Sequence, residues 1–145
     1  MNAADFQGPL LVTVAYVLVY YGTQIHSLRV KNRLSAEYAE RGEKFDRYFG
    51  QDREMLAADR VQLNMLEHMP PFLVLLWLHA AFVDTTSATV AGAVYVGTRL
   101  AYPFALGSRV GRGVRALVMA ATMPGYAVIA WLAGGLILVG PLGWP

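Results

Sequence analysis

One stretch of the sequence combines a cation, an amide and a carboxylate at helical spacing. Arg60, Asn64 and Glu67 stand at positions i, i+4 and i+7, which places them on one face of a helix with about 3.6 residues per turn. A guanidinium attracts anions, a carboxylate attracts cations, and an amide both donates and accepts hydrogen bonds. The helix continues into the apolar residues 72–78, so this ion-binding face enters an apolar environment.

The composition identifies that environment as a membrane. Of the 145 residues, 56% are hydrophobic and 15% are charged, whereas about 25% of residues are charged in an average soluble domain. The chain has no cysteine, which excludes disulfides and thiolate metal sites. All twelve Lys and Arg residues lie in two windows, 29–60 and 99–115. We therefore expect a single integral membrane domain over residues 1–145.

Apolar runs long enough to cross a bilayer occur four times, since about twenty residues of helix span about 30 Å. We expect transmembrane helices at residues 9–28, 62–83, 88–107 and 114–139. The mixed charges of residues 29–59 predict a cytoplasmic connector, part helix and part loop. Pro70 and Pro71 predict a kink in the second helix. The expected fold class is an all-α integral membrane protein, a four-helix transmembrane bundle.

The basic residues also predict the orientation of the bundle. They occur in or beside the first and third connections, which the positive-inside rule places on the cytoplasmic side. Both termini then lie on the non-cytoplasmic side. The first run is interpreted as a retained helix rather than a cleaved signal peptide, because the basic residues follow the run instead of preceding it.

This topology brings a second polar set to the same end of the bundle. Tyr95, Arg99 and Tyr102 share one face of the third helix, and Arg115 begins the fourth helix at the same level. A charge at the bilayer centre costs at least ~2.5–3.5 kcal/mol, so Glu67 and Arg99 should not face lipid. They either form a structural ion pair between the second and third helices or line a water-filled cavity.

Several polar residues also have simpler interpretations. Considered by itself, Arg60 can be a residue whose side chain extends to the lipid headgroups. Tyr95 and Tyr102 can be packing residues or aromatic residues of the membrane interface. His68 and His79 lack further ligands at metal-binding spacing and are interpreted as hydrogen-bonded helix residues, so no metal site is predicted. The sequence has no Gly-rich phosphate loop, no nucleophilic triad and no basic patch with stacking aromatics, and we expect no nucleic-acid partner.

The opening stretch resembles the signature of the MAPEG family, the membrane-associated proteins in eicosanoid and glutathione metabolism. The shared pattern is Arg60, three residues, Asn64, two residues and Glu67, followed by Pro71 and Phe72 at the start of an apolar helix. Intramembrane Arg, Asn and Glu at fixed spacing are rare by chance, which makes the resemblance specific.

Other segments agree with this resemblance, which covers nearly the whole chain. The residues around Arg99 and Tyr102 resemble the third helix of the family. Arg115 occupies the position of the arginine that the glutathione-using members employ in catalysis. Residues 24–29, which end in Arg29, resemble the segment that supplies the arginine of a second subunit.

The resemblance implies a homotrimer that binds glutathione as a co-substrate between neighbouring subunits, near the cytoplasmic face. It implies that Arg115 is catalytic, because a nearby arginine lowers the pKa of a thiol, and the N-terminus of a helix adds positive potential. The second substrate is expected to be a lipophilic small molecule that enters from the membrane lipids. The residues expected to bind glutathione are Arg29, Arg60, Gln62, Asn64, Glu67, His68, Arg99 and Tyr102. Gln62 lies about 200° round the helix from Arg60 and is expected to face a neighbouring site.

Two functions of different classes follow. The first is a glutathione transferase or peroxidase of detoxification or lipid metabolism, whose thiolate attacks lipophilic electrophiles or lipid hydroperoxides. The second is a non-catalytic, lipid-presenting member of the family. Leu106 favours the second, because several catalytic members have a tyrosine four residues after the position of Tyr102. A transporter or channel subunit has little support, since the sequence shows neither inverted repeats nor a charged pore.

Overall fold

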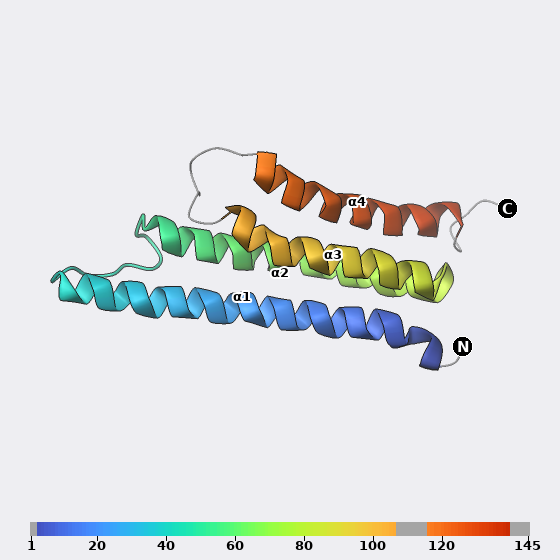
Figure 1. Cartoon of the computed structure of the whole chain (residues 1–145), viewed down its shortest axis with the longest axis horizontal. Helices are drawn as coiled ribbons and strands as arrows, with labels where there is room; N and C mark the ends of the chain where they lie inside the picture. The colour runs from blue at the N-terminus through green and yellow to red at the C-terminus, as the bar shows by residue number, and fades with distance from the viewer. Residues whose placement is uncertain (1–2, 107–115, 140–145) are drawn as a thin grey trace.

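The computed structural model describes residues 3–106 and 116–139 of the chain. Its elements are the short 3₁₀ helix η1 (Ala3–Phe6) and the α-helices α1 (Gln7–Glu40), α2 (Arg53–Phe82), α3 (Thr85–Leu106) and α4 (Ala116–Leu138). The four α-helices lie side by side, and α1 begins at the same end of the bundle at which α4 ends (Figure 1). The predicted all-α four-helix bundle is confirmed, and the described residues contain no strand.

A central pair of helices, α2 and α3, lies between the two outer helices. α2 and α3 pack against each other and against both outer helices, while α1 and α4 lie on opposite sides of that pair (Figure 1). Within the described residues, three helices are long and apolar enough to cross a membrane: Ala4–Glu40, Arg53–Phe82 and Val118–Leu138. α3 has 22 residues, enough length for a span, but its first turns are rich in threonine and serine.

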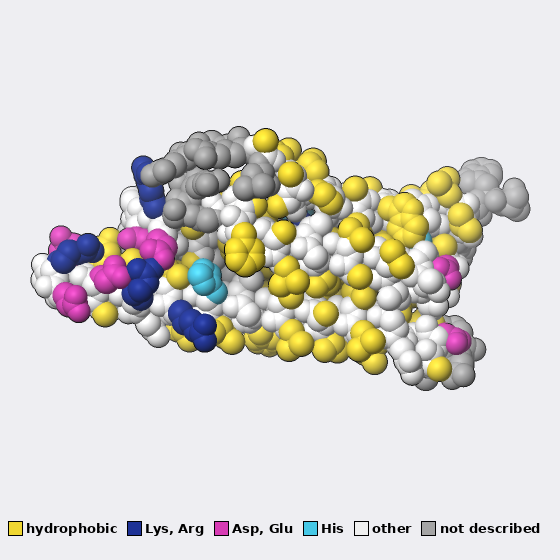
Figure 2. Space-filling view, viewed as in Figure 1, with side chains coloured by type: hydrophobic (Ala, Val, Ile, Leu, Met, Phe, Trp, Pro, Cys, Tyr) yellow, Lys and Arg dark blue, Asp and Glu magenta, His cyan; other side chains and the backbone are white. Residues whose placement is uncertain are grey.

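Both helices beside the first connection are longer than their predicted spans. α1 continues to Glu40 and α2 begins at Arg53, so residues 41–52 alone link them. The extensions hold together because Val30 and Leu34 of α1 pack against Met55 and Ala58 of α2. We call this end of the molecule the basic end, and Lys and Arg side chains gather there (Figure 2).

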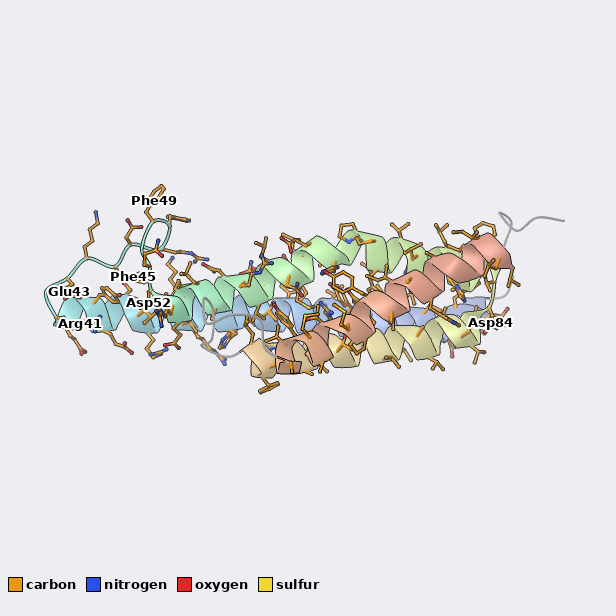
Figure 3. All side chains as sticks on the ribbon, turned by 90° about the horizontal axis from the view of Figure 1, so that it is seen from above. Arg41, Glu43, Phe45, Phe49, Asp52 and Asp84 are labelled. Atoms are coloured by element: carbon orange, nitrogen blue, oxygen red, sulfur yellow. The ribbon has the colours of Figure 1, made fainter. Side chains whose placement is uncertain are left out.

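The link at the basic end is fixed by hydrogen bonds to two aspartates. Asp52 caps α2 by accepting from the backbone N–H groups of the helix, and it also accepts from the Tyr38 hydroxyl at 3.2 Å (Figure 3). Asp59 accepts from the Ser27 hydroxyl at 2.9 Å and from Arg47 at 3.1 Å. These contacts join α1, the link and α2 into one structure.

The opposite connection is shorter than predicted. α3 begins at Thr85, so the link between α2 and α3 consists of residues 83–84. The Asp84 carboxylate accepts a hydrogen bond from the backbone N–H of Ser87 and thereby caps α3. This hydrogen bond holds the pKa of Asp84 below its ordinary value, because it favours the charged form.

Aromatic rings from three helices form the middle of the core. The Phe72 and Tyr95 rings stack with centroids 3.9 Å apart, and Tyr16 of α1 lies 5.1 Å from Phe72. The Tyr16 hydroxyl donates to the backbone carbonyl of Met65 at 2.6 Å. Helix α2 is continuous through its two prolines, and its axis changes direction in the middle of the helix (Figure 3).

A buried histidine joins the ends of three helices. Nδ1 of His79 lies 3.1 Å from the backbone carbonyl oxygen of Leu132 in α4, and Nε2 lies 3.2 Å from Oγ of Ser87 in α3. The prediction that His79 is a hydrogen-bonded helix residue is confirmed. The ring fits because Gly135 has no side chain: a Cβ there would lie 2.4 Å from Cε1 of His79.

Adjacent glycines of α4 provide a matched test of this packing. We expect Gly135→Ala to lower the melting temperature of the detergent-solubilised protein, because the new methyl group collides with His79. Gly134→Ala is the control, since a Cβ there meets nothing within 4 Å and alanine favours a helix by about 1 kcal/mol relative to glycine. Thermal unfolding followed by circular dichroism measures both variants. Equal melting temperatures would show that the His79 ring is not fixed.

Candidate functional site

Arg99 of α3 is the centre of the polar cluster in the bundle. Its side chain is buried, with only 2% of the residue exposed, and Nη1 donates to Oδ1 of Asn64 in α2 at 2.7 Å. Nε donates to the Thr98 hydroxyl at 3.4 Å. The guanidinium carbon lies 5.0 Å from the ring centroid of Tyr95 and 5.9 Å from that of Tyr102. Among the described residues, this cation therefore has neutral partners and no carboxylate.

Helix α4 completes the surroundings of the guanidinium with bare backbone. A Cβ at Gly125 would lie 2.3 Å from Nη2 of Arg99, so only glycine lets the guanidinium lie against α4 here. Sequence reasoning missed this residue. The signal available was the pair Pro124 and Gly125 inside an apolar helix, a combination that weakens a helix unless packing requires it.

Tyr95 brings a second polar group to the same place. Its hydroxyl is buried and has no hydrogen-bond partner among the described residues. An unpaired buried hydroxyl is costly, so such a group in a native core calls for an explanation. The unpaired hydroxyl belongs to the ring that Arg99 covers, so a buried cation without a carboxylate and a buried hydroxyl without a partner lie in the same part of the core.

The ion-binding face of α2 is divided by the fold. Arg60 and Glu67 form an ion pair with Nη1 and Oε1 3.9 Å apart, and their side chains are 52% and 48% exposed. Asn64 turns inward to Arg99 instead. The ion pair considered between Glu67 and Arg99 is therefore not the one that forms, because Asn64 occupies the guanidinium and Arg60 takes the carboxylate. An exposed pair contributes only about 0–1 kcal/mol, so the fold does not depend on it.

Two further predicted site residues contact neighbouring helices. His68 is half-buried, and its Nε2 lies 3.3 Å from the Tyr126 hydroxyl of α4. Tyr102 is buried in a cluster with Val61 and Leu106. Both residues therefore line the junction of α2, α3 and α4 that also contains Arg99.

The remaining predicted residues are not gathered at this junction within one chain. Gln62 is half-buried and Arg29 is exposed, and neither forms a hydrogen bond or ion pair with the described residues. Helix α1 packs on the part of α2 that carries Ala58, about 200° round the helix from Arg60. Arg115, the predicted catalytic residue, lies outside the described residues.

The fold and the buried cation define an integral membrane protein with a polar site between its helices. A comparison with family models matches residues 9–135 to the MAPEG family, and the chain therefore belongs to the MAPEG family. The chain is 31% identical to leukotriene C4 synthase of Bos taurus over 93 residues, which are 63% of this chain and 55% of that protein. It is 30% identical to leukotriene C4 synthase of Cavia porcellus over 93 residues, with the same shares. The chain thus spans about half the length of these curated relatives.

Replacing Asn64 tests whether its amide stabilises the buried guanidinium. We expect Asn64→Leu to lower the free energy of unfolding by about 2–3 kcal/mol, because the cation then loses its acceptor. Asn64→Asp keeps an acceptor of the same shape and adds a countercharge, so its stability should stay close to that of the wild type. Unfolding in mixed micelles, followed by circular dichroism, compares the variants. Equal stability of the Leu and Asp variants would contradict the assigned role.

Proposed function

We propose that this protein is a membrane-bound glutathione transferase that activates the glutathione thiolate for attack on lipophilic electrophiles or lipid hydroperoxides. The observation that carries the proposal is the buried guanidinium of Arg99, which has only neutral partners among the described residues and is stacked on Tyr95 with its unpaired hydroxyl. Membership of the MAPEG family and the similarity to two leukotriene C4 synthases support it.

The charges of the site match those of glutathione. Glutathione carries two carboxylates, an ammonium group and a thiol, so its site needs cations as well as a carboxylate. Arg60 and Glu67 offer one charge of each sign on an accessible face, and exchanging their weak mutual ion pair for ligand contacts costs little. Arg99 offers a second cation deeper in the bundle, held in place by Asn64.

Assembly of several copies would complete the site. Arg29 and Gln62 do not reach the Arg60–Glu67 pair within one chain, so a site that uses all four residues takes Arg29 and Gln62 from a neighbouring subunit. A homotrimer of the kind that the family resemblance implies provides such a neighbour. Glutathione then lies between subunits at the basic end, which the positive-inside rule places on the cytoplasmic side.

Arg115 is proposed to activate the thiol. A cation beside the sulfur lowers the pKa of the thiol and raises the fraction of thiolate at neutral pH. The thiolate forms a carbon–sulfur bond with the electrophile while the leaving group departs with the electron pair of the broken bond. With a lipid hydroperoxide, the sulfur attacks the terminal oxygen and the oxygen–oxygen bond breaks, which yields the alcohol and a sulfenic acid. A second glutathione reduces the sulfenic acid, forming the disulfide and water.

A lipid-presenting protein without catalysis is the second candidate. Leu106 supports it, because this residue is buried in an apolar cluster at a position where several catalytic members of the family have a tyrosine. That hydroxyl is therefore missing beside Tyr102. The two candidates differ in whether glutathione binds at all.

Calorimetric titration with glutathione separates the two candidates. We expect the wild-type protein in detergent to bind glutathione, and Arg60→Ala and Glu67→Ala each to weaken binding by about tenfold, since each removes a charge-assisted contact. Arg41→Ala is the matched control, because Arg41 also forms an exposed ion pair, with Glu43, in the link between α1 and α2. No heat of binding to the wild type would reject the transferase and leave the lipid-presenting protein.

The role of Arg115 is tested on the bound ligand. With glutathione saturating at neutral pH, we expect Arg115→Ala to lose most of the ultraviolet absorbance of the thiolate and most of the conjugation of chlorodinitrobenzene. Arg115→Lys keeps a cation and should keep part of both signals. A thiolate signal that is unchanged in Arg115→Ala would move the activating role to another residue.

A further inference from the structure

A stripe of partly exposed side chains runs along α4, one of the two outer helices (Figure 1). Met119, Met123 and Tyr126 stand at positions i, i+4 and i+7, so they lie within about 60° of one another round the helix. Their exposed fractions are 40%, 45% and 47%. We call these three residues the methionine stripe. The described residues of one chain therefore leave about half of its surface open.

Tyr126 brings a hydroxyl to the methionine stripe, and this hydroxyl contacts α2. Its oxygen lies 3.3 Å from Nε2 of His68, and the two rings meet edge to face with centroids 5.0 Å apart. The neighbouring hydroxyl of Thr122 is used within α4, because it donates to the backbone carbonyl of Val118 at 2.7 Å. The His68–Tyr126 pair is therefore the polar element beside an otherwise apolar stripe.

The pair lies in a part of the bundle that is long and apolar enough to cross a membrane. His68 belongs to the segment Arg53–Phe82 and Tyr126 to the segment Val118–Leu138. Tyr126 stands about 12 Å along α4 from Val118. An ionisable residue inside a membrane span is rare and marks a functional site by default, together with its partner. A half-exposed hydroxyl at this depth calls for a partner besides His68.

The hydrogen-bonding capacity of the Tyr126 hydroxyl determines which ligand it suits. If His68 carries its proton on Nδ1, Nε2 accepts the phenol proton, and the phenol oxygen can still accept a hydrogen bond. If the proton is on Nε2, this nitrogen donates to the phenol oxygen, and the phenol proton is free to be donated. A hydroxyl group both donates and accepts, so it fits either tautomer. A carbonyl or ether oxygen fits only the second.

We propose that the methionine stripe binds the hydrocarbon chain of a lipid and that the His68–Tyr126 pair binds a hydroxyl group of the same lipid. Methionine side chains are flexible and polarisable, so they adapt to a long chain. The pair selects hydroxylated lipids, because only these complete the hydrogen bonds of the phenol. The hydroxyl is a recognition group, and no bond is made or broken at it.

This lipid site lies beside the proposed glutathione site. His68 follows Glu67 directly in α2, and its Nδ1 stays available to glutathione while Nε2 holds Tyr126. In the proposed transferase the hydroxylated lipid is the class of the second substrate, and that identification rests on the proposed function. In a lipid-presenting protein the same lipid is the molecule presented. A neighbouring subunit of the proposed trimer can form the opposite wall of the site.

Binding is measured without glutathione, so the test does not require transferase activity. Tritiated hexadecanol binds the full-length protein in detergent in a scintillation proximity assay, and unlabelled hexadecanol and hexadecane compete for the site. We expect Tyr126→Phe to lower the ratio of hexadecanol affinity to hexadecane affinity about fivefold, as loss of one hydrogen bond does. The ratio cancels the partitioning of each probe into detergent, which is the same for every variant.

Tyr48→Phe is the matched control. Tyr48 is an exposed tyrosine in the link between α1 and α2, far along the chain from α4. Its replacement should keep the wild-type ratio. Met123→Ala should weaken both probes to a similar extent, because it removes part of the apolar contact and leaves the hydroxyl contact in place.

His68 is a positioning residue in this site, and a conservative replacement tests that role. His68→Leu should lower the affinity ratio about threefold, because the phenol is no longer oriented. His68→Gln should restore the ratio, since its amide can hydrogen-bond to the phenol. Equal losses in the two variants would contradict the role of His68.

Three other results would overturn the lipid site: a wild-type ratio in Tyr126→Phe, a fall of the same size in Tyr48→Phe, or full affinity of Met123→Ala for both probes. Calorimetry with glutathione on the same wild-type preparation separates the two proposals. Selective binding of hexadecanol without any heat from glutathione would reject the transferase and keep the lipid site. Glutathione binding without the selectivity would reject the lipid site alone.

Discussion

The arrangement of the bundle depends on keeping one guanidinium out of lipid. Arg99 cannot be left unpaired in an apolar interior, because an isolated buried charge costs far more than any single packing contact returns. Helix α2 must therefore present Asn64, α3 must present the faces of its own tyrosines, and α4 must present bare backbone at Gly125. Each requirement fixes the rotation of one helix about its axis. Three helices are thus oriented by a single side chain.

The polar residues of α2 have different surroundings on the side that faces Arg99 and on the side that faces away from it. Inside, Arg99 is satisfied by a neutral amide, so the pair cannot be separated without exposing a bare cation to the core. Outside, Arg60 and Glu67 share a weak ion pair in a more polar environment. A ligand can replace the outer pair at small cost and leave the inner one intact. The same few turns of α2 therefore carry a buried structural contact on one side and, on the other, the exposed charge pair that we propose as the recognition site.

Hydropathy and charge placement were sufficient to predict the four helices and the basic end. They did not predict that α1 continues to Glu40 and that α2 begins at Arg53. The apolar residues that pair these two segments, Val30, Leu34, Met55 and Ala58, are few and are separated by charged residues in the sequence. Local composition there indicates a solvated connector, and only the pairing of the two helices shows that both continue. Contacts between distant segments decided what local pattern could not.

Local sequence pattern also could not decide which residue of α2 pairs with Arg99. Asn64 and Glu67 are three residues apart on one helix, which separates them by about 60° round its axis. Spacing places both at the right level for Arg99 but does not determine which of them faces α3. In the structure Asn64 is the residue that faces α3, on the side of α2 where Phe72 stacks on Tyr95. A carboxylate would have balanced the charge of Arg99 inside the protein. The amide satisfies the guanidinium by hydrogen bonding but leaves its positive charge unbalanced, and that charge is the feature on which the proposed anion site depends.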